Sequence, residues 1–135
     1  KKEEGDREGD GVYLANGFQL RTTNWVGCFH DDSIEHGLEV PVMGNNHTTT
    51  TCLKACREYT FLALQNQGQC WCGNQLKTGD KWYEIKHRPC GEICKNEDEL
   101  RPIRFCGDVE TNAVFKVETL RVNVATGGRP TDGSV

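Results

Sequence analysis

The sequence predicts a small disulfide-rich α+β domain, in which one main helix packs on a β-hairpin. Eight cysteines occur among 135 residues, and all of them lie between Cys28 and Cys106, a density typical of disulfide scaffolds. Only 36% of the residues are hydrophobic, which is a small fraction for a domain whose core has no covalent cross-links. A helix-like segment with a C-x3-C spacing precedes two strand-like runs, the second of which carries C-x-C. We therefore expect four disulfides to stabilise one domain.

The chain divides into one domain and two flanks. Residues 1–23 are predicted to form a flexible or extended N-terminal flank, because the first eleven are highly charged and include no apolar side chain. Within this flank, residues 12–20 are typical of extended chain that can add a strand, and Asn16-Gly17 is a turn signal. The compact domain should span residues 24–117. Residues 118–135 are predicted to be an extended C-terminal flank that ends in a linker rich in glycine and proline.

Inside the domain, the sequence predicts one helix, one hairpin and a long loop. Thr49, Thr50 or Thr51 can cap a helix that continues through CLKACREY. The runs FLALQN and QCWCGN, joined by a glycine-containing turn, predict the hairpin. Residues 74–104 show little periodicity and should be loop with short elements. Residues 114–124 alternate β-branched and polar side chains, which indicates one or two further strands.

The spacing of the four central cysteines predicts how the helix meets the hairpin. Cys52 and Cys56 are four residues apart and share one face of a helix, with about 6 Å of rise between them. Cys70 and Cys72 are two residues apart and share one face of a strand, at about 6.6 Å. Because these separations match, a helix lying on the hairpin can form two parallel disulfides. The spacing leaves open which helix cysteine meets which strand cysteine.

Composition and spacing argue against several other classes of protein. None of the cysteine pairs has the C-x2-C spacing of structural zinc sites, and the four histidines follow no ligand spacing. We therefore expect no metal and no cofactor. A net charge of −4 is unlike that of nucleic-acid-binding proteins, and no apolar run approaches the roughly 20 residues that span a bilayer. No nucleophile or paired carboxylates stand on an identifiable scaffold, so we expect no enzyme.

Several strings around the cysteines resemble WSC domains over residues 24–117. The strings that carry the resemblance are Trp25-Val26-Gly27-Cys28-Phe29 with Asp31, Cys52-Leu53-Lys54-Ala55-Cys56 with Tyr59, Cys70-Trp71-Cys72-Gly73-Asn74, the pair Cys90 and Cys94, and Cys106-Gly107 with Phe115. The resemblance implies a PAN/apple-like fold, with a helix cradled by a twisted antiparallel sheet. It also implies the disulfides Cys28–Cys90, Cys52–Cys70, Cys56–Cys72 and Cys94–Cys106.

WSC domains act outside the membrane as carbohydrate-binding or adhesion modules, so the resemblance implies a secreted or ectodomain location. The candidate ligand-binding residues are aromatic side chains and short polar groups, namely Trp71, Trp82, Tyr83, Tyr59, Asn74 and Asp31. Aromatic rings offer large rigid faces to sugar rings. The primary hypothesis is a non-catalytic module that binds a glycan or polysaccharide. The alternative is a structural or protein–protein adhesion module, in which the same aromatics pack on a partner or a neighbouring domain.

Some of these residues also have ordinary structural explanations. Trp71 lies between two cysteines of one strand, so its side chain points away from the disulfides and is either exposed or covered by another layer. Trp25 and Phe29 are expected to pack around the disulfide of Cys28. Asn74 is typical of a turn residue, and Asp31 can cap a loop. Asn46 begins an N-glycosylation sequon, Asn46-His47-Thr48, which an extracellular location would make usable.

Overall fold

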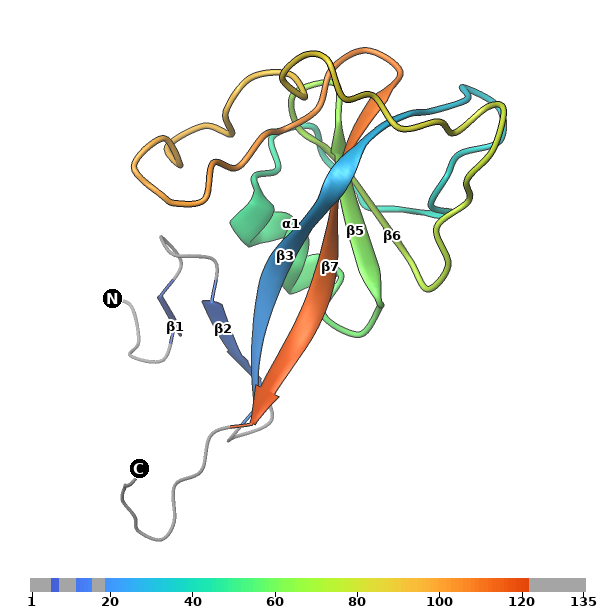
Figure 1. Cartoon of the computed structure of the whole chain (residues 1–135). Helices are drawn as coiled ribbons and strands as arrows, with labels where there is room; N and C mark the ends of the chain where they lie inside the picture. Colours follow the sequence, from blue (N-terminus) through green and yellow to red (C-terminus); the bar gives the residue numbers. More distant parts are fainter. Residues whose placement is uncertain (1–5, 8–11, 16–18, 122–135) are drawn as a thin grey trace, which may run out of the picture.

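The computed structural model describes residues 6–7, 12–15 and 19–121 and shows one helix lying on an antiparallel sheet (Figure 1). The sheet has seven strands in the order β1-β2-β3-β7-β5-β6-β4. The elements are β1 (Asp6–Arg7), β2 (Val12–Ala15), β3 (Gln19–His30), β4 (Val40–Pro41), α1 (Thr49–Ala55), β5 (Phe61–Gln65), β6 (Gln69–Gly73) and β7 (Thr111–Arg121). The predicted α+β class, with one main helix on an antiparallel sheet, is confirmed.

The strands at the two ends of the domain form one long ladder. β3 pairs with β7 from Gln19 opposite Arg121 to His30 opposite Thr111. The predicted strand in residues 114–124 is a single strand that begins at Thr111, and residues 12–20 contribute β2 and the start of β3. β3 and β7 each continue across the predicted domain limits, and the division at 24 and 117 stays a prediction. The Asn16-Gly17 turn, most of residues 1–11 and the C-terminal linker lie outside the described residues.

A β-bulge in β3 decides which side chains face the helix. Trp25 pairs with Phe115 and Gly27 pairs with Val114, so Val26 is the extra residue. Residues three apart on a regular strand point to opposite faces, but a bulge reverses this alternation. Trp25 and Cys28 consequently share the helix face, where Cys28 joins the core and the Trp25 ring lies 5.2 Å from the Phe115 ring.

The helix is shorter than predicted and begins one residue earlier. Its N-cap is Thr48, which has an extended backbone. Thr48 Oγ1 accepts a hydrogen bond from Thr51 N, while Thr51 Oγ1 accepts one from Thr48 N. The sequence suggested Thr49, Thr50 or Thr51 as the cap. The reciprocal capping box explains why Thr48 is the cap instead. The helix ends at Ala55, so Cys56 is its C-cap. The predicted continuation through Tyr59 is therefore wrong.

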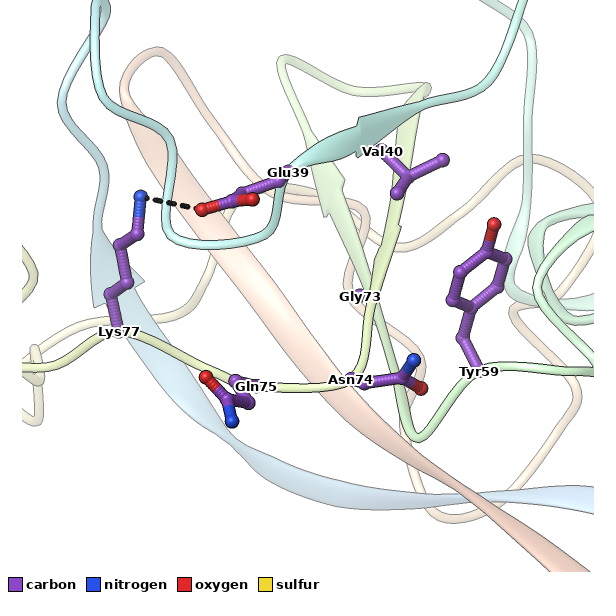
Figure 2. Close-up of a pocket in the computed structure, with 7 residues that line it drawn as sticks. All are labelled: Glu39, Val40, Tyr59, Gly73, Asn74, Gln75 and Lys77. Carbon is purple, nitrogen blue, oxygen red and sulfur yellow. Dashed lines mark ion pairs between the residues drawn. The ribbon is translucent and has the colours of Figure 1, made fainter.

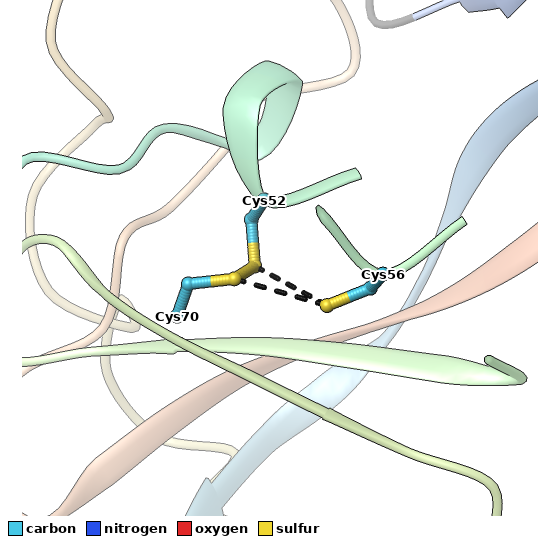
Figure 3. Close-up of side chains that lie close together, drawn as sticks. All are labelled: Cys52, Cys56 and Cys70. Carbon is cyan, nitrogen blue, oxygen red and sulfur yellow. Dashed lines mark hydrogen bonds between the residues drawn. A yellow bond between two sulfur atoms is a disulfide. The ribbon is translucent and has the colours of Figure 1, made fainter. Parts of the chain in front are cut away.

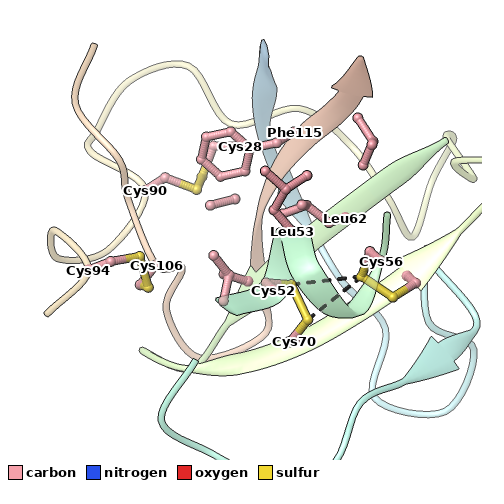
Figure 4. Close-up of a cluster of buried hydrophobic side chains, with 14 of the residues drawn as sticks. Cys28, Cys52, Leu53, Cys56, Leu62, Cys70, Cys90, Cys94, Cys106 and Phe115 are labelled. Atoms are coloured by element: carbon pink, nitrogen blue, oxygen red, sulfur yellow. Dashed lines mark hydrogen bonds between the residues drawn. A yellow bond between two sulfur atoms is a disulfide. The ribbon is translucent and has the colours of Figure 1, made fainter. Parts of the chain in front are cut away.

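All four disulfides implied by the family resemblance are present, and no cysteine is free. They join Cys28 to Cys90, Cys52 to Cys70, Cys56 to Cys72 and Cys94 to Cys106. The two disulfides that join Cys52 in α1 and its C-cap Cys56 to β6 have Cα separations of 5.6 Å and 5.3 Å, as the helix-on-strand geometry predicts. Together with Leu53, Leu62 and Phe115 they form the main core between α1 and the sheet (Figure 4).

The opposite face of the sheet carries a second, smaller core. Leu38, Ala63 and Val114 are fully buried there, and Phe29 and Trp71 pack against them. The sequence suggested that Phe29 packs around the Cys28 disulfide, but Phe29 is the next residue of β3 after Cys28 and therefore points to this second face. Residues 74–104 hold no helix or strand beyond isolated bridges, which confirms the predicted loop. The sheet thus lies between a disulfide-linked helix and a layer of loops.

A buried carboxylate fixes the loop before Arg104 to the start of the helix. Glu97 accepts bonds from Thr49 N and Thr49 Oγ1 with one carboxylate oxygen, and from Thr50 N and Thr50 Oγ1 with the other, at 2.7–3.2 Å. The first backbone N–H groups of a helix have no partner within it, so an outside acceptor satisfies them. Glu97 consequently holds a loop and a helix in one arrangement.

Replacing this carboxylate should destabilise the domain. Glu97→Gln leaves at least one buried donor without its acceptor, and we expect the free energy of unfolding to fall by about 1–3 kcal/mol. Chemical denaturation with the disulfides intact measures the change. Glu99→Gln, at an exposed position two residues away, is the matched control and should shift stability by less than about 0.5 kcal/mol. Equal stability of the two variants would contradict this role of Glu97.

Candidate functional site

Three of the predicted ligand-binding aromatics meet at one loop, residues 30–37. Tyr83 stacks on His30 with ring centroids 4.8 Å apart and planes 4° apart. Trp82 Nε1 donates a hydrogen bond to the backbone oxygen of Glu35 at 2.8 Å. Trp71 stacks on His36 at 4.1 Å. We call Trp71, Trp82, Tyr83 and residues 30–37 the aromatic site.

The buried carboxylate of Asp31 holds the loop of the aromatic site in place. One oxygen of this carboxylate accepts the backbone N–H of Gly37 at 2.7 Å, and the other accepts bonds from His36 Nδ1 at 2.6 Å and Gln65 Nε2 at 2.9 Å. Asp31 is only 1% exposed. Of the two roles that the sequence allowed for Asp31, the structure agrees with the loop cap: its oxygens are buried and occupied, and they position His36 and the loop.

The exposure of the aromatic side chains differs within the site. Trp71 points away from the disulfides, as the alternation of β6 requires, but His36 covers it and it packs against the second core. Of the two alternatives for Trp71, burial beneath another layer is therefore the closer description. Tyr83 is 50% exposed. Trp82 is partly buried, with the ammonium groups of Lys77 and Lys81 at 5.6 Å and 6.0 Å from its ring. Tyr83 and Trp82 thus form the accessible part.

Charged groups fix the outer turn of the same loop. Asp32 accepts the backbone N–H groups of Glu35 and Ile34, and these bonds hold the pKa of its carboxyl below the usual value. Glu35 pairs with Lys81 at 2.7 Å. The hydrogen bond from Lys81, followed by its charge, lowers the pKa of Glu35, and the same contact raises the pKa of Lys81. Glu35, whose backbone oxygen accepts the Trp82 hydrogen bond, therefore lies in a turn that is charged and ordered at neutral pH.

A pocket of about 290 Å³ lies beside the aromatic site (Figure 2). It brings together Tyr59 and Asn74, two further predicted ligand-binding residues, and its lining is Glu39, Val40, Tyr59, Gly73, Asn74, Gln75 and Lys77. Figure 2 shows Tyr59 on one side and the Glu39–Lys77 ion pair, at 3.0 Å, on the other. Asn74 Oδ1 accepts bonds from Thr60 N and Thr60 Oγ1. Asn74 thus connects the end of β6 to the residue that precedes β5. We call this the Tyr59 pocket.

Lys77 connects the two features. Its ammonium group pairs with Glu39 in the Tyr59 pocket and lies 5.6 Å from the Trp82 ring centroid in the aromatic site. Its backbone N–H also donates to Gly37 O. Sequence reasoning missed Lys77, Glu39 and Gln75, because isolated polar residues in a loop have no spacing that predicts a pocket. The Tyr59 pocket and the aromatic site together form one candidate ligand surface.

Three cysteine sulfurs gather in the core, but they do not form a metal centre. The Sγ atoms of Cys52, Cys56 and Cys70 lie within 4.8 Å of one another (Figure 3). Each belongs to a disulfide, and a disulfide sulfur is not the thiolate that binds zinc. The cluster is the junction of two neighbouring cross-links, and its function is structural. In the described part of the chain, no helix has the length and apolar character needed to cross a membrane.

These observations define a class of protein: a small disulfide-rich α+β module whose helix is cross-linked twice to one strand. The family model of the WSC domain matches residues 25–108, and the chain belongs to the WSC domain family. The match covers all eight cysteines and every residue of the aromatic site and the Tyr59 pocket. No solved structure matches the chain.

The pKa shift of Glu35 gives a direct test of the loop geometry. Because its pKa is lowered in the folded state, the contribution of the Lys81 pair is present at neutral pH and is lost as pH falls through that pKa. An NMR titration of the Glu35 carboxyl carbon should give a midpoint below 4.5. Lys81→Met should raise the midpoint, whereas Lys86→Met should leave it unchanged. A midpoint unaffected by Lys81→Met would contradict the ion pair.

Proposed function

We propose that this WSC domain is a non-catalytic module that binds a glycan or polysaccharide outside the cell. The observation that carries the proposal is that Lys77 lines the Tyr59 pocket and also lies 5.6 Å from the ring of Trp82, the neighbour of Tyr83 in the chain. Tyr83 offers half of its surface to solvent. Sugar rings pack their apolar faces on such side chains, while their hydroxyl groups bond to short polar groups.

The chemistry of the Tyr59 pocket supports a sugar as the ligand. Glu39 and Lys77 neutralise each other, and Gln75 and Asn74 add amide donors and acceptors. A ligand rich in hydroxyl groups can bond to all of these groups without bringing a charge of its own. The volume of about 290 Å³ is at the small end of ligand pockets. It suits a single ring of a longer chain that continues over the aromatic site.

Four disulfides support a location outside the cytosol. Structural disulfides form and persist in oxidising compartments, such as the secretory pathway and the cell exterior. No cysteine is left as a thiol, so the domain suits those surroundings. The module would therefore bring the rest of a secreted protein or ectodomain to a carbohydrate surface.

A protein partner is the second candidate for the same surface. Ile34, at the outer turn of the aromatic site, is 87% exposed, and an exposed aliphatic side chain beside aromatics is typical of protein interfaces. Sugars gain little from such a side chain. Binding of a protein would therefore depend on Ile34, whereas binding of a glycan would depend on Tyr83 and Trp82.

Glycan binding should be lost when the accessible aromatics are removed. We expect the domain to bind at least one neutral oligosaccharide on a glycan array. Calorimetry with that soluble sugar should show that Tyr83→Ala and Trp82→Ala each weaken binding about tenfold or more, a loss of about 1.4 kcal/mol. Trp25→Ala removes an exposed tryptophan outside the site and is the matched control. Ile34→Asp should leave sugar binding within about twofold.

The result that contradicts the proposal is equally specific. An array without hits, or hits that Tyr83→Ala and Trp82→Ala leave unchanged, would exclude this surface as a glycan site. Loss of binding to a protein partner in Ile34→Asp would then favour the second candidate.

We also propose that Asn46 carries an N-linked glycan. Asn46 is exposed in the loop before α1 and begins the sequon Asn46-His47-Thr48. Expression through a secretory pathway should give a protein whose mass falls by one glycan after peptide-N-glycosidase treatment, and Asn46→Gln should abolish that change. Thr48→Ser keeps both the sequon and the helix cap, so it should retain the glycan. An unmodified wild-type chain would show that Asn46 is not used.

A further inference from the structure

An apolar strip on the helix side of the sheet is left uncovered by the fold. Trp25 is 44% exposed and Ile93 is 39% exposed. The Trp25 ring lies 6.0 Å from the Phe105 ring, and Ile93 pairs with Phe105 in an antiparallel bridge. Residues opposite each other in such a pair have neighbouring side chains. We call Trp25, Phe105 and Ile93 the Trp25 strip.

Two hollows flank the Trp25 strip, and Phe105 lines both of them. The first, of about 260 Å³, includes Trp25, Glu84, Lys86 and Arg88. The second, of about 550 Å³, includes Ile93, Glu92, Lys95 and Asp98. Neither is lined by Trp82 or Tyr59, so the strip and its hollows are separate from the candidate ligand surface.

The two hollows carry opposite net charges. In the first, Lys86 and Arg88 outnumber Glu84, which gives a charge of +1. In the second, Glu92 and Asp98 outnumber Lys95, which gives a charge of −1.

Among the described residues, the acidic partners of the basic groups in the first hollow lie close to the distance limit of an ion pair. Lys86 lies 3.9 Å from Glu84, and Arg88 lies 3.8 Å from Asp108. Arg88 also donates to Thr111 Oγ1 at 3.5 Å. Such long contacts between partly exposed groups are weak, so both basic groups can turn toward a partner.

We propose that the Trp25 strip is the interface of a symmetric homodimer. In a two-fold dimer, each surface patch meets its own copy turned by 180°. An axis through Phe105 would place the positive hollow of one copy on the negative hollow of the other, and would bury Trp25 and Ile93 in the centre. Apolar aromatic residues at the centre with complementary charges at the edges are the usual anatomy of a protein interface. A second copy of the chain fits this surface, because each copy carries both the positive hollow and the negative hollow that faces it across the interface.

Such a dimer would also change the strength of ligand binding. Two copies joined by the Trp25 strip carry two candidate ligand surfaces, and a polysaccharide chain that reaches both binds more tightly than one site allows. This consequence rests on the proposed function, but the dimer itself does not.

Analytical ultracentrifugation of the full chain tests the dimer. We expect a monomer–dimer equilibrium between about 1 µM and about 1 mM, the range of affinities of small interfaces. Ile93→Asp should raise the dissociation constant about tenfold or more, because it places a charge at the centre of the interface. Ile34→Asp, an equivalent change at an exposed isoleucine of the aromatic site, is the matched control and should have no effect.

A charge exchange distinguishes the specific dimer from nonspecific self-association. Arg88→Glu alone and Glu92→Arg alone should each weaken the dimer, whereas the double variant should regain at least most of the wild-type affinity, since the charges then match again. A chain that stays monomeric throughout the range would overturn the proposal. So would a dimer that Ile93→Asp leaves intact, or one that the double variant fails to restore. None of these results depends on whether the domain binds a glycan.

Discussion

The pair of disulfides between the helix and β6 is the constraint on which the rest of the structure depends. The helix has only seven residues, fewer than an isolated helix needs to be stable in water. Cys52–Cys70 and Cys56–Cys72 hold it against the sheet from its middle and from its end. With the helix fixed, Leu53 and Leu62 close the main core. A domain with few apolar residues can then keep one folded arrangement.

The same disulfides also place the candidate ligand surface. Cys70 and Cys72 must both face the helix, so Trp71 between them must face the other way. There it packs on the second core and beneath His36. Asp31 holds His36 and the loop in that position, and the loop in turn offers the acceptor for Trp82. The cross-linked side of the sheet gives rigidity and the opposite side carries the aromatic site, while Tyr59 and Val40 of the Tyr59 pocket pack against the helix-side core.

Much of this arrangement could be predicted from the sequence, because cysteine spacing is a geometric constraint. The i, i+4 and i, i+2 spacings predicted a helix linked twice to one strand, and the family resemblance supplied the pairing. The sequence did not predict the bulge at Val26, which has no signal of its own and which places Trp25 on the same face as Cys28. It also did not predict that Asp31 would be buried, since its partners Gln65 and His36 lie at unrelated positions in the chain. Individual contacts of this kind exist only after the chain has folded.

The central claim is that the cross-linked helix supports a ligand surface made of the aromatic site and the Tyr59 pocket, away from the helix itself. Mapping of backbone and indole NMR signals during titration with an oligosaccharide tests this claim most directly. The account predicts that the indole N–H of Trp82 and the amides of residues 30–37 and 73–77 shift, while those of residues 49–55 in the helix do not. Shifts confined to the helix, or to Trp25 and its neighbours, would contradict it.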